Sequence, residues 1–382
     1  MNILFVTPNN PFDIFTGGNQ RTNLLLNACA KIANVDVIAF SKCQEGQRFN
    51  LLWAEEVETP QTGRLQKFMQ LCMAWHPWGL ASLNKQKQMI IDEACKKKHY
   101  DYIVIRYVHQ AIECGLLKYK QKLIVDVDDT PYDAKIRDSL NVKSYRNKIF
   151  YILTALLSKI ALRSFVNQVH VCFFSNSLQA KIYRSPLLPN VPYYDVNIED
   201  IEPRKIVPQR LMFIGDMAYS PNIIGTNHFL KHVFPMIRKR FPQVSFHIVG
   251  RVFDESLKEE WMKSGAVVTG FVDSIIQEYA EAECVVVPIY SGGGTCIKIL
   301  EAMQMMRPIV TTQKGFRGYD VFFTNNEDIV VAKNDEDFVN AVSLILSCKE
   351  LQKEMSLNAK MKYEQYFSKQ KFFDIVWKHL TW

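Results

Sequence analysis

Hydrophobic positions in the first half of the chain fall into short, uninterrupted runs separated by longer amphipathic stretches. The runs cover residues 2–7, 35–40, 102–106, 123–127 and 169–175, and polar residues follow them. Between residues 21 and 32, apolar residues instead recur at helical spacing. Continuous apolar strands that alternate with helices indicate a parallel sheet covered on both faces.

The second half of the chain restarts this alternation. We predict strands at 210–214, 244–249, 266–269, 284–288 and 308–312, and helices at 227–241, 275–282, 296–306 and 337–348. Residues 187–192 hold two prolines and precede an acidic stretch, as is typical of a linker. We therefore predict an α/β protein with two Rossmann-like doubly wound domains facing a cleft, formed by residues 1–190 and 191–365.

The C-terminal tail is predicted to be helical and is rich in aromatic residues. These are Tyr363, Phe367, Phe372, Phe373, Trp377 and Trp382. Chain termini are poorly ordered unless they are tied down, so a tail this apolar is expected to dock. We predict that residues 366–382 form a helix that crosses back onto the N-terminal domain; the alternative is packing on its own domain.

Charge is distributed unevenly between the two halves. Residues 1–190 hold 24 Lys and Arg against 15 Asp and Glu, whereas residues 191–382 hold 22 against 24. This asymmetry suggests an anionic partner for the first half: membrane lipid, a phosphorylated acceptor or nucleic acid. The alternative is a solvated basic face without a partner.

Residues 143–163 alternate basic and apolar side chains, as does a second basic and aromatic stretch at 64–78. The first stretch has the character of an amphipathic helix lying on an anionic membrane. The alternative is a core-facing helix with exposed lysines. No window of 18 uncharged apolar residues occurs, so no spanning helix is predicted. The N-terminus is interpreted as a strand and not as a signal peptide.

The most informative string runs from Val285 to Met303, where an apolar strand leads through glycines into a helix. The loop comprises Ser291, Gly292, Gly293, Gly294 and Thr295. Glycines let the backbone approach a ligand closely, and a helix N-terminus favours anions, so the string predicts a diphosphate site. Thr295 is predicted to cap the helix, Lys298 to reach phosphate oxygens and Glu301 to accept ribose hydroxyls. The alternative is a surface turn with an ordinary ion pair.

In this string and its surroundings, residues 210–320 resemble the group 1 (family 4) glycosyltransferases. Their Gly-x-Gly-Thr-Arg-x-Lys-x-Leu-Glu-Ala signature is matched around 292–302, together with segments 213–222, 248–250, 268–273 and 308–312. The resemblance implies the GT-B fold, with Glu301 on the donor ribose and the glycine loop and Lys298 on the diphosphate. It also implies that Gly215, Asp216 and Tyr219 face the diphosphate and that Phe271 and Val272 lie beside the base. Gly293 stands where many members carry glutamate, and Cys296 replaces the signature arginine, so the transferred sugar is left open.

The first half offers further candidates at the ends of its predicted strands. Gly17 and Gly18 precede the helix that bears Arg21, and this loop is predicted to close over the donor phosphate; the alternative is a plain βα turn. Asp128 and Asp129 end a strand and are predicted to act as a general base or to orient the acceptor; the alternative is capping or turn chemistry.

His109 lies where some members of the family place a catalytic or donor-contacting histidine, and a structural role is the alternative. The clustered carboxylates would suit a divalent metal. The resemblance implies catalysis without one, so no metal and no other cofactor is predicted.

The resulting hypothesis is transfer of a sugar from a UDP- or GDP-sugar to a saccharide or lipid-linked hydroxyl in cell-surface polysaccharide synthesis. The resemblance implies retention at the anomeric carbon. We expect a cytoplasmic enzyme, peripheral to the inner face of the plasma membrane. Nucleic acid is not an expected partner, because it would leave Glu301 and the glycine loop unused. The alternatives are a nucleotide-sugar epimerase of the same fold and a non-catalytic sugar-nucleotide-binding protein.

Overall fold

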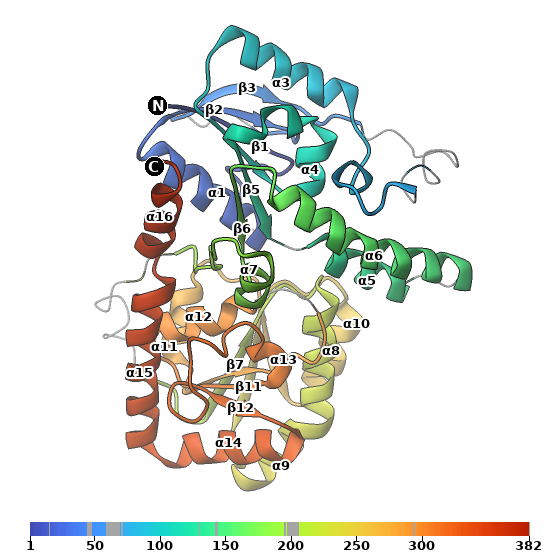
Figure 1. Ribbon diagram of the computed structural model, residues 1–382. Coiled ribbons are helices and arrows are strands. Elements are labelled where there is room, and N and C mark those ends of the chain that lie inside the picture. The colour runs from blue at the N-terminus through green and yellow to red at the C-terminus, as the bar shows by residue number, and fades with distance from the viewer. Residues whose placement is uncertain are drawn as a thin grey trace. The chain divides into compact units, whose positions relative to one another are not determined.

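The computed structural model describes residues 1–14, 16–43, 48–58, 69, 72–128, 130–141, 144–194, 196, 206–292 and 295–381 (Figure 1). Three predicted site residues, Asp129, Gly293 and Gly294, lie outside this range. The chain divides into two compact units. Unit 1 comprises Met1–Pro189 and Phe372–Trp382, and unit 2 comprises Asn190–Lys371.

Unit 1 is built on a parallel six-stranded sheet. Its strands are β1 (Asn2–Thr7), β2 (Asn34–Ala39), β3 (Asn50–Ala54), β4 (Tyr102–Arg106), β5 (Leu123–Asp128) and β6 (Val171–Phe174). They lie in the order β3-β2-β1-β4-β5-β6. Strand β3 was not predicted: its apolar run, Leu51–Ala54, is only four residues long, and its side chains are partly buried or exposed.

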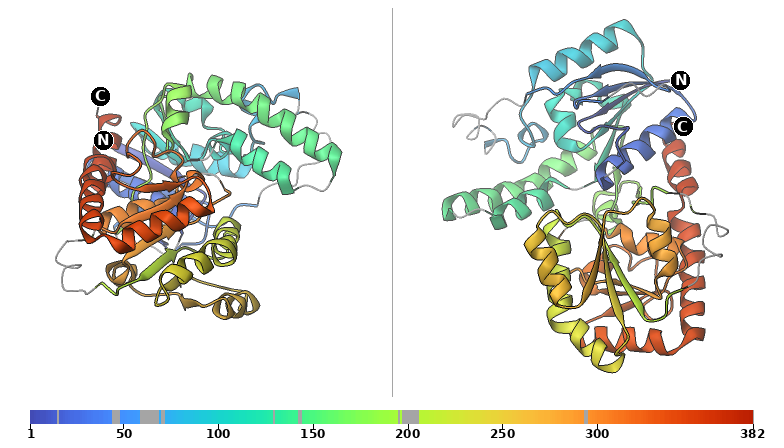
Figure 2. Two further views of the ribbon diagram at one scale, coloured as in Figure 1. Left: turned by 90° about the horizontal axis from the view of Figure 1, so that it is seen from below. Right: turned by 180° about the vertical axis from the view of Figure 1, so that it is seen from behind.

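The helices of unit 1 are α1 (Gly17–Ala30), η1 (Pro77–Gly79), α3 (Lys85–Lys97), α4 (Val108–Glu113), η2 (Leu116–Lys122), α5 (Pro131–Asn141), α6 (Tyr145–Val166) and α7 (Ser177–Tyr183). Helix α1 begins four residues before the predicted helix, because the Thr16 side chain accepts a hydrogen bond from the Asn19 backbone and caps it. Helices α5 and α6 pack side by side and project from the sheet, as both figures show (Figures 1 and 2).

The C-terminal helix α16 (Lys369–Lys378) ends within unit 1. The Trp377 indole donates to the Ala28 carbonyl of α1 at 2.7 Å, and the Lys31 ammonium lies 4.6 Å from the Phe373 ring centroid. Phe372, Phe373 and Val376 are buried. The aromatic residues of the tail therefore form part of the packing around α1.

Unit 2 repeats the architecture of unit 1 with a different sequence. Its strands are β7 (Arg210–Ile214), β8 (Ser245–Val249), β9 (Ala266–Gly270), β10 (Cys284–Val287), β11 (Ile309–Thr312) and β12 (Val330–Ala332). Their order, β12-β11-β10-β7-β8-β9, is the order of unit 1 read from the other edge. The predicted pair of doubly wound α/β domains is thus confirmed.

The helices of unit 2 are α8 (Ser220–His228), η4 (Phe229–Val233), α9 (Phe234–Arg240), α10 (Glu255–Lys263), α11 (Ile275–Glu281), α12 (Ile297–Gln304), α13 (Gln313–Phe316), α14 (Asp335–Ser347) and α15 (Lys349–Phe367). Helix α8 begins seven residues before the predicted helix, with Pro221 in its first turn, where a missing N–H costs nothing. Helix α10, which Asp254 caps, was not predicted.

Both strand orders reverse direction next to the first strand of the unit. The reversal lies between β1 and β4 in unit 1, and between β7 and β10 in unit 2. Doubly wound sheets bind ligands at the carboxyl ends of the strands that flank such a switch point. The loops after these four strands are therefore where a site is expected in each unit.

Candidate functional site

The glycine loop follows β10 at the switch point of unit 2, and its first residues are tied to neighbouring strands and helices. The Thr312 hydroxyl donates to the Ile289 carbonyl, and Tyr290 lies against the His228 ring with its hydroxyl 3.5 Å from Asp335. Within the described residues, the buried Ser291 hydroxyl has no hydrogen-bond partner. A buried hydroxyl of this kind suits a ligand that approaches the loop.

Lys298 lies in the first turn of α12 and is buried. Its ammonium donates to the Asn222 side chain at 2.9 Å and lies 4.3 Å from the Phe213 ring centroid. Burial lowers the pKa of Lys298. A side chain on Gly215 would come within 3.0 Å of this ammonium and 2.6 Å of the Asn222 amide nitrogen. A side chain at this position would therefore displace the Asn222 and Lys298 side chains from each other or from their present positions.

Glu301 lies one turn further along α12. Its carboxylate accepts a hydrogen bond from the Tyr279 hydroxyl at 2.8 Å. Burial raises the pKa of Glu301, and the Tyr279 hydrogen bond and the charge of Lys298 oppose that rise. A carboxylate has room for about four hydrogen bonds. With Tyr279 as its hydrogen-bond partner in the described part of the chain, Glu301 keeps acceptor capacity for a ligand.

The first βα loop of unit 2 lies beside the glycine loop. Gly292 adopts a φ of 101°, and a side chain there would come within 2.9 Å of the Tyr219 hydroxyl. Asp216 forms an ion pair with Arg251 at 2.7 Å. Arg251 also lines a pocket of about 230 Å³ together with Phe253 and the exposed Phe271. The predicted residues Gly215, Asp216, Tyr219, Gly292 and Lys298 are thus brought together, whereas Val272 does not line this pocket.

The capping role predicted for Thr295 is wrong. Helix α12 begins at Ile297, so Cys296 takes the N-cap position, and no side chain caps the helix there. The Thr295 hydroxyl instead accepts a hydrogen bond from the Asn190 side chain at 2.9 Å. The Tyr319 hydroxyl donates to the Cys296 carbonyl at 3.1 Å. The first N–H groups of α12 are consequently not occupied by a capping side chain.

In unit 1, a chain of buried charges lies beneath the switch point. Asp126 pairs with Arg21 at 2.6 Å and with Arg106 at 2.9 Å, and Arg106 also pairs with Asp128 at 2.6 Å. Arg21 also donates to the Leu188 and Pro189 carbonyls. Burial alone would raise the pKa of Asp126, but the two guanidinium groups outweigh it and hold that pKa below its usual range.

This network corrects the role predicted for Arg21. The side chain is only 4% exposed, and its donors are used by Asp126 and the chain around Leu188. A donor phosphate would have to displace one of these hydrogen-bond partners. Sequence patterns gave no sign of this pairing, because Arg21 and Asp126 lie 105 residues apart.

Asp128 ends β5 and remains partly accessible. It has a φ of 53°, and its side chain is 24% exposed. Tyr107, which follows the adjacent strand β4, has a φ of 68°. Non-glycine residues at positive φ are strained, and such strain is concentrated at functional sites. The carboxyl edge of β4 and β5 is therefore the candidate acceptor side of unit 1.

The remaining candidates of unit 1 lie near this edge. His109 belongs to the first turn of α4 and not to the end of a strand, where it is exposed and stacks on Tyr107 with 5.5 Å between ring centroids. Gly17 and Gly18 begin α1, and the Gly18 carbonyl accepts a hydrogen bond from Arg106 at 3.0 Å.

Several residues of these sites were not singled out from the sequence. Asn222 lies inside the matching segment 213–222, so its position was a usable signal. Tyr279 and Arg106 bear on Glu301 and Asp126 only through tertiary contacts. Tyrosine and arginine in such positions have no local pattern that distinguishes them from surface residues.

Comparison with known proteins assigns this geometry to a family. The model of the glycosyl transferases group 1 family matches residues 208–348, which contain the glycine loop, Lys298 and Glu301. Unit 2 carries a group 1 glycosyltransferase domain. The enzyme is therefore a glycosyltransferase, and the family resemblance predicted from residues 210–320 is confirmed.

A relative of this glycosyltransferase is an uncharacterized 44.6 kDa protein in the cps region of Klebsiella pneumoniae. It is 25% identical over 301 residues, which cover 74% of each chain.

Three solved structures share the fold across the whole glycosyltransferase. A glycosyltransferase from Rickettsia africae has a TM-score of 0.62 at 12% identity, with coverage of 100% of this chain and 98% of that one. Anabaena HepE, solved with UDP and glucose, has a TM-score of 0.63 at 13% identity, with 99% of each chain covered. WaaG, a glycosyltransferase involved in lipopolysaccharide biosynthesis, has a TM-score of 0.61 at 14% identity, with coverage of 98% and 99%. At these identities the likeness shows the GT-B fold.

Proposed function

We propose that this glycosyltransferase moves a sugar from a nucleoside diphosphate sugar to a hydroxyl of a saccharide or lipid-linked acceptor in cell-surface polysaccharide synthesis. The observation that carries the proposal is the arrangement of the glycine loop, Lys298 and Glu301 on β10 and α12. Anabaena HepE has been solved with UDP-glucose and with UDP, which favours a UDP-sugar as donor. The cps-region relative and WaaG favour a surface polysaccharide as product.

The donor would bind unit 2 through its nucleotide. Glu301 would accept hydrogen bonds from the ribose hydroxyls, and the pocket lined by Phe271, Phe253 and Arg251 would hold the base. The uncapped N-terminus of α12 and the Lys298 ammonium would stabilise the charge that develops as the diphosphate leaves. This chemistry needs no bound metal. EDTA is accordingly expected to leave turnover unchanged.

Asp128 is proposed to act on the acceptor hydroxyl. It is the accessible end of the ion-pair chain, with Arg106 holding its carboxylate. A general base contributes about 10²–10⁴-fold to a rate. Asp128→Asn should therefore lower kcat by about 100-fold with donor affinity unchanged, and full turnover of this variant would rule the role out.

The activity itself is tested by incubating the full chain with UDP- and GDP-sugars, with and without lipid-linked and free saccharide acceptors. Transfer that needs an acceptor supports the proposal, and the anomeric configuration of the product, read by NMR, tests the proposed retention. Release of an epimerised sugar without acceptor would contradict it. Thermal shifts with UDP and GDP identify the base, since a nucleotide stabilises the fold according to its affinity.

We also propose that α6 docks the enzyme on the inner, anionic face of the plasma membrane. Its exposed face carries apolar residues at helical spacing: Tyr145, Ile149, Ile152, Leu153, Leu156 and Ile160. Arg146 and Lys148 are exposed on either side of this face, and α6 contains no acidic residue. An apolar face flanked by cations suits the boundary between lipid headgroups and acyl chains.

The packing of α6 favours a helix that lies on a membrane over one that crosses it. In length and composition, α6 could span a bilayer, with a mean hydropathy of 1.7. Its opposite face, however, is buried against the protein through Ala155, Ser158, Ala161, Leu162 and Phe165. A helix with one face committed to unit 1 has only the other face free for lipid.

The double variant Leu153→Asp/Leu156→Asp tests this surface. Burial of a leucine side chain in an apolar phase contributes about 1.5–3 kcal/mol. Loss of two leucines should therefore weaken binding to vesicles with 30% phosphatidylglycerol by at least about 100-fold. Leu344→Asp/Leu357→Asp, at two exposed leucines of unit 2, is the matched control. Equal binding of the two variants in co-sedimentation would contradict the proposal.

A further inference from the structure

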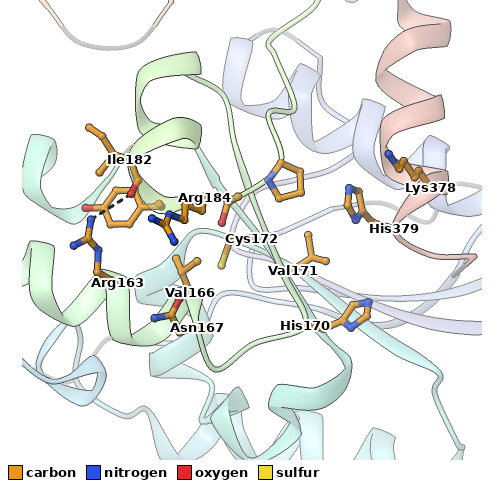
Figure 3. Close-up of a pocket in the computed structure, with 13 residues that line it drawn as sticks. Arg163, Val166, Asn167, His170, Val171, Cys172, Ile182, Arg184, Lys378 and His379 are labelled. Carbon is orange, nitrogen blue, oxygen red and sulfur yellow. Dashed lines mark hydrogen bonds between the residues drawn. The ribbon is translucent and has the colours of Figure 1, made fainter.

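A second concave surface of unit 1 has no role in the proposed reaction. It is a pocket of about 740 Å³ between the end of α6, the start of β6, the loop after α7 and the end of α16 (Figure 3). Five basic side chains line it: Arg163, His170, Arg184, Lys378 and His379. No aspartate or glutamate is among the lining residues. These five residues are called the basic pocket.

The walls of the basic pocket are held in place by packing and backbone contacts. The Arg163 guanidinium donates to the Ile182 carbonyl at 3.3 Å. The His379 ring packs edge-on against Phe173 at 5.5 Å, and the His170 ring lies 5.2 Å from Tyr102. Figure 3 shows Arg163 and Arg184 on one side of the hollow and Lys378 and His379 on the other. Basic side chains thus come from opposite walls of one hollow.

Among the described residues, the side chains of the basic pocket have no acidic partner. Burial lowers the pKa of His379, and the neighbouring Lys378 and His170 lower it further. Like charges that crowd one another in this way are relieved when an anion binds between them. Phosphate groups suit such a site, because arginine matches their geometry with two parallel hydrogen bonds.

The position of the basic pocket separates it from the proposed catalytic edge. Val171 and Cys172, at the amino end of β6, line the pocket, whereas Asp128 and Tyr107 follow the carboxyl ends of β5 and β4. Arg163 also ends the exposed face of α6, one turn after Ile160. A ligand in the pocket would therefore lie at the end of the surface proposed to contact lipid.

We propose that the basic pocket binds a phosphate group, carried either by an anionic phospholipid headgroup or by a free phosphate compound. The pocket itself stands on its own geometry. Only the choice of a lipid as the source of the phosphate rests on the proposed membrane docking of α6.

The test removes two charges from opposite walls of the pocket in the full chain. Arg184→Gln/Lys378→Gln is compared with Lys181→Gln/Lys371→Gln, which removes two exposed cations from the same helical segments outside the pocket. Binding is measured to phosphatidylcholine vesicles with 30% phosphatidylglycerol and to pyrophosphate. The pyrophosphate measurement is made by calorimetry in the presence of saturating UDP, which occupies the diphosphate site proposed in unit 2. Each cation near an anionic surface is worth about fivefold in affinity, so the pocket variant should bind about 25-fold more weakly. The control variant should change by less than about threefold.

The outcomes separate the source of the phosphate from the existence of the site. Selective loss of vesicle binding supports a lipid headgroup, and selective loss of pyrophosphate binding supports a free phosphate compound. Equal losses in the two double variants would show an effect of net charge and overturn the proposal. So would pyrophosphate and vesicle binding that the pocket variant leaves unchanged.

The Leu153→Asp/Leu156→Asp variant distinguishes a failure of the proposed membrane docking from a failure of the proposed phosphate site. If α6 docks on lipid, this variant loses vesicle binding and keeps pyrophosphate binding. If the wild-type chain does not bind vesicles, the pyrophosphate measurement still tests whether the basic pocket binds phosphate.

Discussion

The switch points of the two sheets have the same strand order and opposite uses of polar residues. In unit 1, the charges beneath the switch point are paired with one another, through Arg21, Asp126 and Arg106. In unit 2, the equivalent region holds glycines, a Ser291 hydroxyl with no hydrogen-bond partner among the described residues, and the Glu301 carboxylate, which has spare acceptor capacity. The same sheet topology can therefore carry either charged residues that pair with one another or polar groups that keep hydrogen-bonding capacity for a ligand.

Net charge follows the same division. The basic surplus belongs to residues 1–190, whose described surface carries the exposed face of α6 and three of the five residues of the basic pocket, Arg163, His170 and Arg184. Residues 191–382 are nearly neutral and contain the loop proposed for the diphosphate. Unit 1 thus carries exposed cations in addition to the buried Arg21 and Arg106, whereas unit 2 is proposed to hold a diphosphate with backbone N–H groups and one buried lysine.

The largest expected effect is a loss of stability when the buried ion pairs at the switch point of unit 1 are broken. Arg21→Ala removes one of the two guanidinium partners of the buried Asp126 and leaves only Arg106. Removing one partner of a buried ion pair costs about 3–5 kcal/mol in the free energy of unfolding. Denaturant unfolding followed by circular dichroism measures this loss, with the exposed Lys96→Ala on α3 as the control. UDP affinity, measured where the variant is folded, should be unchanged. Unchanged stability with lost UDP affinity would instead restore Arg21 as a phosphate ligand.

The next effect concerns the ligand-binding edge. Glu301→Ala should weaken UDP binding on the order of 100-fold, since hydrogen bonds to a charged group contribute about 1.5–3 kcal/mol each. Calorimetry with UDP gives the affinity. Tyr279→Phe, which removes only the hydroxyl that contacts Glu301, should cause a smaller loss. An unchanged affinity in Glu301→Ala would refute the ribose role.

A matched pair of glycines compares the two switch points directly. A side chain on Gly215 would come within 3.0 Å of Lys298 and closer to Asn222, whereas one on Gly17 would meet nothing within 4 Å. Gly215→Ala should therefore lower donor affinity by about tenfold and cost about 1–3 kcal/mol of stability. Gly17→Ala, in the first turn of α1, should be neutral or slightly stabilising. Similar losses from both substitutions would mean that crowding does not distinguish the two edges.

The smallest expected effect is on the pH dependence of the free energy of unfolding in acid. Arg21 and Arg106 hold the pKa of Asp126 below its unfolded value of about 3.9. Its contribution to stability is then fully present above about pH 4 and is lost as the pH falls through the lower folded value. Asp126→Asn should remove this part of the acid dependence, read from urea unfolding midpoints between pH 5 and pH 3. An unaltered slope would show that other carboxylates govern acid unfolding.

The strands could be predicted where the sequence is continuously apolar. Both β1 and β4 match their predicted bounds, as does β7. The partly buried β3 was missed because its apolar run, Leu51–Ala54, is short. Helix α10 was missed because its apolar residues, Leu257, Trp261 and Met262, are too few to show a period. Helix starts were shifted at α1 and α8, where a capping threonine and a first-turn proline decide the boundary.

The sequence by itself determined the two-domain α/β fold and the place of the glycine loop between a strand and a helix. Both depend on local order along the chain: buried strands read as apolar runs, and the spacing from Ser291 to Glu301 lies within one strand–loop–helix unit. Tertiary structure alone decided which charges are available. Arg21 is paired with Asp126, Lys298 is buried beside Asn222, and Arg163 is brought to Lys378, because residues distant in sequence meet only when the sheet and its helices pack.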